Sequence, residues 1–389
     1  MTTTGQNREF DIVVFGATGF TGGMTAEYLA RHAPPDLKLA IAGRNLQKLE
    51  AIKARLVALD ERHAALGTIE AAIDDPESLA RMAARTRVLL TTVGPFIDYG
   101  EPTVRACIAA RTDYVDSTGE PEFVRILLER YSDQAAQAGV RLVPSCGFDA
   151  IPADLGAFFT VNQLPQGEPI RLNGYLTIRA TFSGGTERST IKSLARPLRE
   201  ADGARPATPG RRLRVLPARI QRHPQLGGWS GPMPTIDASV VLRSATALER
   251  YGPDFSYAHH SIHASFIALI AALWVFGLLM FLGRFARVRE LLLNMVKKSG
   301  EGPSKEQMNK QWFKLCFVGE SAGKTVTTQI AGGDPGYRET SKMLAESALC
   351  LARDRERLPD RAGVLTPAVA MGNVLLERLD RAGLKFERL

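Results

Sequence analysis

A short apolar run near the N-terminus leads directly into three glycines, and this segment constrains the fold more than any other part of the chain. Residues 11–22 read Asp-Ile-Val-Val-Phe-Gly-Ala-Thr-Gly-Phe-Thr-Gly. A buried strand can turn sharply into a helix at Gly16, bare backbone at Gly19 leaves room for phosphate oxygens, and Gly22 lets the helix pack closely on the strand. The N–H groups that begin such a helix attract anions. The segment therefore predicts a binding site for a nucleotide with a pyrophosphate.

The sequence that follows the glycines supports this prediction over a simple glycine turn. Residues 21–31 have helical spacing, and a second strand over 37–42 follows at the expected distance. That strand ends at Gly43-Arg44-Asn45, where an acidic residue would hold the adenosine ribose hydroxyls. A guanidinium at this point favours a 2′-phosphate, so the predicted cofactor is NADP rather than NAD. The alternative is that Arg44 only covers a surface loop.

Strand and helix patterns alternate through the first part of the chain. Further strands are expected over 68–72, 88–93, 113–116 and 141–144, with helices over 46–59, 77–84, 102–110 and 121–138. Repeated alternation indicates an α/β fold of the Rossmann type, with a doubly wound parallel sheet that binds ligands at the carboxyl ends of its strands. The predicted cofactor-binding residues are Gly16, Thr18, Gly19, Phe20, Thr21, Gly22, Arg44, Asn45, Asp74, Gly94 and Pro95.

A chain of 389 residues is too long for a single core. We expect an NAD(P)-binding Rossmann domain over 1–150 and an inserted mixed α+β substrate domain over 151–339. Helices over 340–389 are expected to return to the Rossmann domain. Thr366-Pro367 and Gly383 are typical of the cap, first turn and end of the last helix.

Charge and cysteine usage disfavour several classes of protein. The formal net charge is +8, and residues 196–222 hold eight arginines against two acidic residues in a stretch rich in proline and glycine, which predicts an exposed loop. That stretch lacks interleaved aromatic residues and a nucleic-acid motif, so no nucleic-acid partner is expected. The four cysteines form no Cys-x-x-Cys pair, so neither a metal site nor a disulfide framework is indicated. A polar N-terminus without room for a signal peptide favours the cytoplasm.

Residues 264–283 form an uncharged stretch of twenty residues, bounded by histidines and then by Arg284, Arg287 and Arg289. Its length as a helix matches the hydrocarbon thickness of a bilayer. Three alternatives are open for this stretch. It could be a core helix, buried in its own domain or in a homodimer, or it could attach to one leaflet of a membrane. It could also span the membrane, but a full span would separate the two halves of the protein. Leaflet attachment predicts a peripheral location on the inner face of the membrane, helped by the arginines of 196–222.

Two familiar motifs are incomplete. Residues 319–325 resemble a phosphate-binding loop but have three residues between the glycines where four are needed, so a hairpin turn is expected there. No tyrosine is followed by a lysine four positions later, so the catalytic pair of short-chain reductases is absent. His259, His260 and His263 are interpreted as a polar helix end rather than as metal ligands.

Three loops follow successive strands: Gly94-Pro95-Phe96, Asp116-Ser-Thr-Gly-Glu120 and Ser145-Cys-Gly-Phe-Asp149. Together with the glycine turn, the run 147–156, Gly184-Gly185-Thr186, the helix containing Glu346 and the run 363–368, they resemble the saccharopine dehydrogenase family over nearly the whole chain. The similarity is to its branch of saccharopine dehydrogenase-like oxidoreductases and bacterial trans-acting enoyl reductases. The resemblance implies an NAD(P)-binding fold. On that branch it also implies reduction of a carbon–carbon double bond in acyl chains made by a separate polyketide synthase.

Reduction of an enoyl thioester needs a group that stabilises the enolate and a proton for the α carbon. The candidate catalytic residues on or near the three loops are Tyr99, Ser117, Cys146 and Asp149. Each has a plainer alternative role, as a packing residue, a turn former, a small buried side chain and a helix cap, respectively.

Three functions are compatible with the sequence. The first is an NADP-dependent reductase of a lipid or polyketide-derived acyl substrate, which the apolar stretch 264–283 favours. The second is a carbon–nitrogen oxidoreductase acting on an amino acid, as the family name suggests. The third is a non-catalytic nucleotide-binding protein at a lipid surface, because no complete catalytic signature is present.

Overall fold

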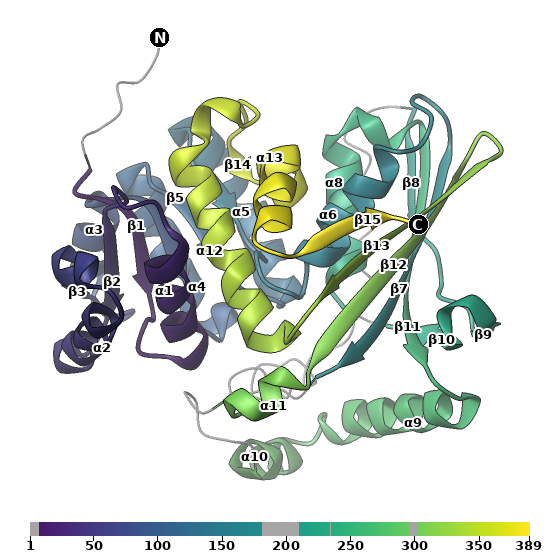
Figure 1. Ribbon diagram of the computed structural model, residues 1–389, viewed down its shortest axis with the longest axis horizontal. Helices are drawn as coiled ribbons and strands as arrows, with labels where there is room; N and C mark the ends of the chain where they lie inside the picture. Colours follow the sequence, from purple (N-terminus) through teal and green to yellow (C-terminus); the bar gives the residue numbers. More distant parts are fainter. Residues whose placement is uncertain (1–7, 181–209, 234, 296–301) are drawn as a thin grey trace. The chain divides into compact units, whose positions relative to one another are not determined.

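The chain forms two compact units, each with its own sheet (Figure 1). The computed structural model describes residues 8–180, 210–233, 235–295 and 302–389. Unit 1 comprises Met1–Thr118, Glu122–Gly147 and Thr340–Leu365, and unit 2 comprises Gly119–Pro121, Phe148–Glu339 and Thr366–Leu389. The predicted motif Gly184-Gly185-Thr186 lies outside the described residues.

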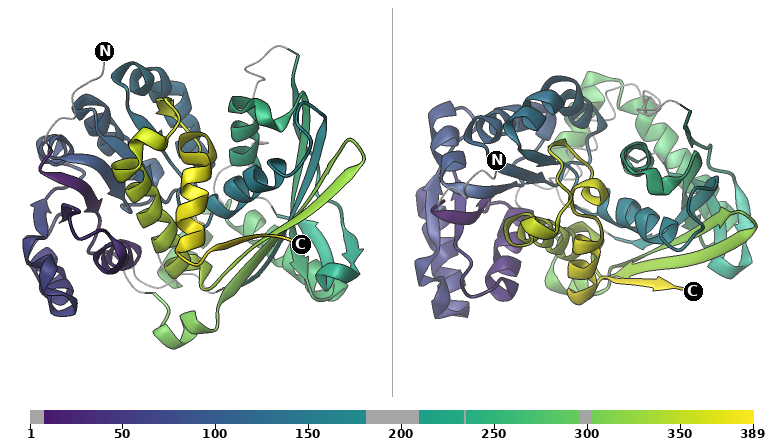
Figure 2. Two further views of the ribbon diagram at one scale, coloured as in Figure 1. Left: turned by 45° about the horizontal axis from the view of Figure 1, so that its top comes forward. Right: turned by 90° about the horizontal axis from the view of Figure 1, so that it is seen from above.

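The described part of unit 1 contains a parallel sheet of seven strands in the order β14-β6-β5-β4-β1-β2-β3 (Figure 2). The strands are β1 (Phe10–Phe15), β2 (Leu39–Gly43), β3 (Gly67–Glu70), β4 (Thr86–Thr91), β5 (Asp113–Asp116), β6 (Arg141–Val143) and β14 (Gly363–Val364). The direction of winding reverses at β1, which lies between β2 and β4. Doubly wound sheets bind their ligands at this reversal. The predicted Rossmann-type fold is therefore confirmed.

Helices cover both faces of this sheet (Figure 2). They are α1 (Phe20–His32), α2 (Leu46–Leu59), α3 (Pro76–Ala84), α4 (Phe96–Ala110), α5 (Pro121–Ala138) and α12 (Thr340–Arg353). The helix expected over 102–110 thus begins earlier, at Phe96. α12 comes from the C-terminal part of the chain and packs beside α1, where the Tyr28 hydroxyl donates to Glu346 Oε1 at 2.9 Å. Because α12 is buried along most of its length, it completes the core of unit 1.

The described part of unit 2 contains a mixed sheet of eight strands. Seven follow the order β15-β13-β12-β7-β11-β10-β9, and β8 pairs with β11. The strands are β7 (Ile170–Arg179), β8 (Arg212–Val215), β9 (Gln221–His223), β10 (Gly228–Pro232), β11 (Asp254–His263), β12 (Trp312–Ser321), β13 (Lys324–Gly332) and β15 (Lys385–Arg388). Ser321 pairs with Lys324 across a tight turn, so the hairpin expected at 319–325 is confirmed.

Three helices pack against one another or against the sheet in unit 2: α6 (Ile151–Val161), α8 (Asp237–Ala247) and α13 (Pro367–Arg381). A Cβ at Gly156 would lie 2.3 Å from the Phe317 ring, so only glycine lets α6 approach β12 this closely. The fully buried Asp154 of α6 accepts hydrogen bonds from Ser244 of α8 and from the Ala368 N–H of α13. Desolvation raises the pKa of Asp154 to about 6.

Two predictions about the second half of the chain differ from the structure. The last helix, α13, belongs to unit 2, whereas the sequence predicted that both C-terminal helices return to the Rossmann domain. The predicted loop over 196–222 is described only from residue 210, and its described part contains β8 and β9. Arg211 there donates to the Gly252 carbonyl at 2.9 Å. At least one of the arginines therefore holds the fold together.

The apolar stretch 264–283 forms α9 (Phe266–Leu282), which is followed by α10 (Ala286–Met295) and the short α11 (Lys305–Asn309). Only Leu269 of α9 is buried, so the interpretation as a core helix within unit 2 is wrong. Within the described residues, no helix combines the length and the apolar character that a membrane span requires.

Candidate functional site

The turn from β1 into α1 has the geometry that the glycines predict. Gly16 has a φ of +92°, which disfavours other residues. A Cβ at Gly22 would lie 2.3 Å from the Gly16 carbonyl oxygen, so Gly22 allows the close contact between helix and turn. Gly19 is the N-cap and offers no capping side chain, and the first turn of α1 contains no acidic residue. The helix N-terminus therefore suits the phosphates of a dinucleotide, and the glycine cradle fits such a group.

Thr92 supports this turn and was missed by the sequence analysis. Its hydroxyl donates to the Gly16 carbonyl at 3.4 Å, and a Cβ at Gly22 would lie only 2.6 Å from the same hydroxyl oxygen. Thr92 directly follows β4, the strand beside β1, so its position depends on the pairing of strands that are distant in the sequence. An alternation of strands and helices indicates that β4 exists but does not reveal this contact.

The end of β2 lies beside the glycine turn. A Cβ at Gly43 would lie 3.8 Å from the Thr18 side chain, so the strand end and the turn are neighbours. The next residue, Arg44, is exposed, and Asn45 caps α2 by accepting a hydrogen bond from the Lys48 N–H at 2.9 Å. A guanidinium is therefore accessible near the turn, whereas the amide of Asn45 already has a structural partner.

The remaining predicted cofactor residues lie at the carboxyl edge of the same sheet. Asp74 is exposed and lies between β3 and α3. Gly94 and Pro95 follow β4 and are joined by a cis peptide bond, and Pro95 is the N-cap of α4. Tyr99 is 42% exposed in the first turn of α4, so it is not a packing residue of the core.

Asp116 connects the two loops that carry Ser117 and Cys146. Its buried carboxylate accepts hydrogen bonds from the Thr118 N–H, the Ser145 N–H and the Tyr114 hydroxyl, each at 2.8 Å. Its carbonyl accepts one from the Cys146 N–H at 2.7 Å. These bonds fix the backbone at the carboxyl ends of β5 and β6.

The side chains of Ser117 and Cys146 differ in access. Ser117 is half-buried, and its Cβ lies 3.7 Å from where a Cβ at Gly147 would be. Cys146 is fully buried, and its thiol donates to the Val143 carbonyl at 3.4 Å. The structure therefore favours the plainer role of Cys146 as a small buried side chain.

Asp149 and Asp237 form a pair of carboxyl groups in unit 2. Asp149 is exposed. Protein atoms packed around its carboxyl group partly desolvate it, and this desolvation together with the nearby Asp237 raises its pKa to about 6. Desolvation also raises the pKa of Asp237 to about 7, although the Thr235 hydroxyl donates a hydrogen bond to it. A Cβ at Gly119 would lie 2.7 Å from Asp149 Oδ2, so Gly119 makes room for this carboxyl group.

A buried tyrosine and histidine on β11 belong to the same unit. The Tyr257 hydroxyl lies 2.7 Å from His259 Nδ1, and Asp237 acts electrostatically on Tyr257. Desolvation lowers the pKa of His259 to about 4, so its ring is neutral at pH 7. His259, His260 and His263 lie on a strand, so their interpretation as a polar helix end is wrong.

Unit 1 offers a glycine cradle that suits the phosphates of a dinucleotide, and the exposed Arg44 at the end of β2 near that cradle. Together, these features are those of a dehydrogenase or reductase that uses a nicotinamide nucleotide.

Comparisons with known proteins agree with this assignment. Residues 12–143 match the saccharopine dehydrogenase NADP binding domain. A protein of Mycobacterium tuberculosis named as a trans-acting enoyl reductase is 37% identical, with 99% of this chain and 98% of that protein covered. A trans-acting enoyl reductase of Mycobacterium bovis is 35% identical, with 97% of each chain covered. Apo saccharopine dehydrogenase of the L-Glu-forming type from Saccharomyces cerevisiae has a similar fold, with a TM-score of 0.56 and 15% identity over 98% of this chain and 100% of that one. The chain therefore belongs to the saccharopine dehydrogenase family and is an NADP-dependent oxidoreductase.

Proposed function

We propose that this oxidoreductase is an enoyl reductase that reduces a carbon–carbon double bond in a lipid or polyketide-derived acyl substrate. The observation that carries the proposal is the match, over nearly the full length of both chains, to relatives named as trans-acting enoyl reductases. The fold alone does not select this reaction, because it also serves a saccharopine dehydrogenase.

The cofactor-binding residues are assigned in unit 1. The backbone of Gly16, Gly19 and Gly22, with the first turn of α1, suits the pyrophosphate, and Arg44 suits the 2′-phosphate. The other residues proposed to line this site are Thr18, Phe20, Thr21, Asn45, Asp74, Gly94 and Pro95. When bound, NADPH supplies a hydride to the β carbon of the enoyl group.

Asp149 is proposed as the donor of the proton that the α carbon receives. Its pKa of about 6 leaves part of the population protonated at neutral pH, and the resulting carboxylate regains a proton from solvent. In the sequence, Asp149 ends the loop after β6 that the sequence analysis singled out. Tyr99 and Ser117 remain candidates for stabilising the enolate oxygen, whereas the burial of Cys146 disfavours it.

The setting of the reaction is part of the same proposal. An apolar acyl substrate is most concentrated at lipid surfaces, so we propose a cytoplasmic enzyme that is peripheral on the inner face of the membrane. The predicted homodimer, which would cover the apolar stretch 264–283 with a second copy, stays a prediction.

The test combines nucleotide binding with turnover. Purified protein is titrated with NADPH and with NADH, and NADPH consumption is then followed with and without an enoyl thioester. Arg44→Ala should weaken NADPH binding about tenfold or more, because a charge-assisted contact is lost, and should leave NADH binding unchanged. Arg81→Ala is the matched control, since Arg81 pairs only with Asp75 and Glu77 among the described residues.

The outcomes separate the alternatives. NADPH consumption that requires the enoyl thioester supports the reductase. Tight NADPH binding without consumption would instead favour a non-catalytic nucleotide-binding protein. If neither nucleotide binds, the assignment of the glycine cradle is wrong.

A further inference from the structure

Helix α9 is the most exposed apolar element among the described residues. Ile267 is 80% exposed, Trp274 73% and Val275 58%. Large side chains of this kind are normally buried, and an exposed set of them marks a surface that binds something apolar. The helix therefore needs an occupant around it.

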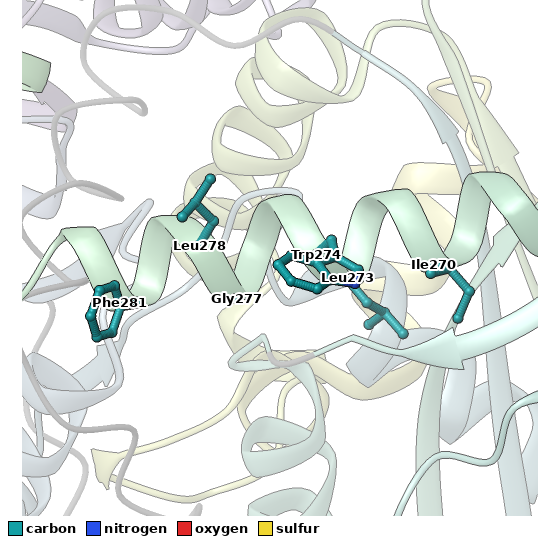
Figure 3. A pocket seen from close by; sticks show the side chains of 6 residues that line it. All are labelled: Ile270, Leu273, Trp274, Gly277, Leu278 and Phe281. Atoms are coloured by element: carbon teal, nitrogen blue, oxygen red, sulfur yellow. The ribbon is translucent and has the colours of Figure 1, made fainter.

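The exposed side chains surround the helix rather than forming one stripe. Successive residues of an α-helix are rotated by about 100°, so Trp274, Val275 and Phe276 point in three directions, and all three are exposed. The groove along α9 lies on one face of the helix and is lined by Ile270, Leu273, Trp274, Gly277, Leu278 and Phe281 (Figure 3). Val275, Phe276 and Leu279 lie outside that face and are exposed as well. A partner subunit would cover one side of α9 and leave the other sides in water, whereas the acyl chains of lipids would surround the helix on every side.

The beginning of α9 is attached to the described part of unit 2. Leu269 is fully buried, and a Cβ at Gly231 of β10 would lie 2.2 Å from its Cδ1, so Gly231 makes the pocket for this side chain. The rings of Trp229 and Phe266 also pack at a centroid distance of 5.0 Å. The rest of the helix extends beyond this attachment (Figure 1).

The charges at both ends of α9 are positive. Arg284 and Arg287 follow the helix and are exposed, and the sequence has no acidic residue between Asp254 and Glu290. At the other end, exposed Arg222 pairs in register with Trp229, which contacts α9. Exposed arginines beside an apolar helix complement the anionic headgroups of a membrane leaflet.

We infer that α9 inserts into the acyl-chain region of one leaflet of an anionic membrane, with Arg222, Arg284 and Arg287 at the headgroups. At about 1.5 Å per residue, its 17 residues are about 25 Å long, which is less than the hydrocarbon core of a bilayer. The inference rests on the proposed peripheral location, but it concerns lipid binding and is independent of the reaction.

The test is flotation of the purified full-length chain with vesicles, without nucleotide or substrate. Vesicles of phosphatidylcholine mixed with phosphatidylglycerol should carry the protein, and vesicles of phosphatidylcholine alone should bind it more weakly. Trp274→Asp with Leu278→Asp should reduce binding at least about tenfold, because charged groups resist transfer into hydrocarbon. Arg284→Gln and Arg287→Gln should each cost about fivefold on anionic vesicles only.

Two controls keep the result interpretable. Leu59→Asp alters a side chain of α2 that is 47% exposed, and it should leave vesicle binding unchanged. Thermal unfolding of each variant, measured without lipid, checks that the fold is intact. Trp274→Phe should keep vesicle binding but lose most of the blue shift in tryptophan fluorescence that lipid produces.

Three results would overturn the inference: no flotation with either vesicle, an equal loss in Leu59→Asp, or a dimer that the α9 variants dissociate in sedimentation without any lipid binding. The last result would identify a second copy as the occupant. None of them bears on enoyl reduction, which is assayed without vesicles.

Discussion

The glycine turn of unit 1 and the carboxyl pair of unit 2 are built in opposite ways. The turn consists of residues within one short segment, and its chemistry comes from backbone that glycine leaves bare at Gly16 and Gly22. The pair joins the exposed Asp149 and the buried Asp237, which are far apart in the sequence, and its chemistry comes from side chains whose pKa values the surrounding protein raises. The proposed cofactor binding therefore follows from a local motif, whereas the proposed proton donation depends on tertiary structure.

The largest expected effect tests the carboxyl pair. Asp149→Asn removes the proposed proton donor with little change in shape, so kcat for an enoyl thioester should fall about 10²–10⁴-fold while NADPH affinity is kept. Steady-state kinetics and a nucleotide titration measure both quantities. Asp133→Asn, an exposed change on α5, is the control and should leave kcat unchanged. An unchanged kcat in Asp149→Asn would move the assignment to Tyr99 or Ser117.

The next effect tests the glycine turn. A Cβ at Gly22 would lie 2.3 Å from the Gly16 carbonyl oxygen, so Gly22→Ala must move α1 away from the turn. We expect a loss of about 1–3 kcal/mol in the free energy of unfolding. NADPH should bind about 100-fold more weakly, because the backbone donors are displaced. Fluorescence titration and denaturant unfolding measure the two effects.

Gly277→Ala is the matched control for that change. Gly277 lies inside α9, and a Cβ there would meet no atom within 4 Å. An alanine should therefore keep NADPH affinity and raise the free energy of unfolding by about 0.5–1 kcal/mol, because glycine is a poor helix former. Equal losses of NADPH affinity in the two variants would disprove the close-contact explanation.

The sequence predicted the elements that are determined by residues close together in the chain. The strand before Gly16, the fingerprint and the cap of α13 at Thr366 follow from residue types at fixed spacing, and the structure contains each of them. The supporting hydroxyl of Thr92 was missed because strand pairing brings it to the turn.

Elements that depend on contacts between residues distant in the sequence were harder to predict. The sequence offered Asp149 as a candidate because of its loop but did not reveal Asp237, which begins a helix in a different part of unit 2. The histidines of β11 were taken for a helix end because their neighbour α9 dominates the local hydropathy, whereas pairing with β7 determines their strand conformation. Packing also assigned α13 to unit 2, since its first turn is bonded to Asp154 of α6.

The smallest expected effect concerns how Asp237 controls the acidity of Asp149. Asp149 and Asp237 have pKa values of about 6 and 7, both raised by desolvation, and the nearby Asp237 raises the pKa of Asp149 further. The donor is active when protonated, so kcat should be high below pH 6 and fall as the pH rises through the pKa of Asp149, about 6. Asp237→Asn removes the neighbouring charge and lowers that pKa. The decline in kcat should therefore begin at lower pH, and the rate at pH 7 should drop although the rate at low pH is kept. A pH profile of kcat measures the shift, and a profile that Asp237→Asn leaves in place would mean that the two carboxyl groups titrate independently.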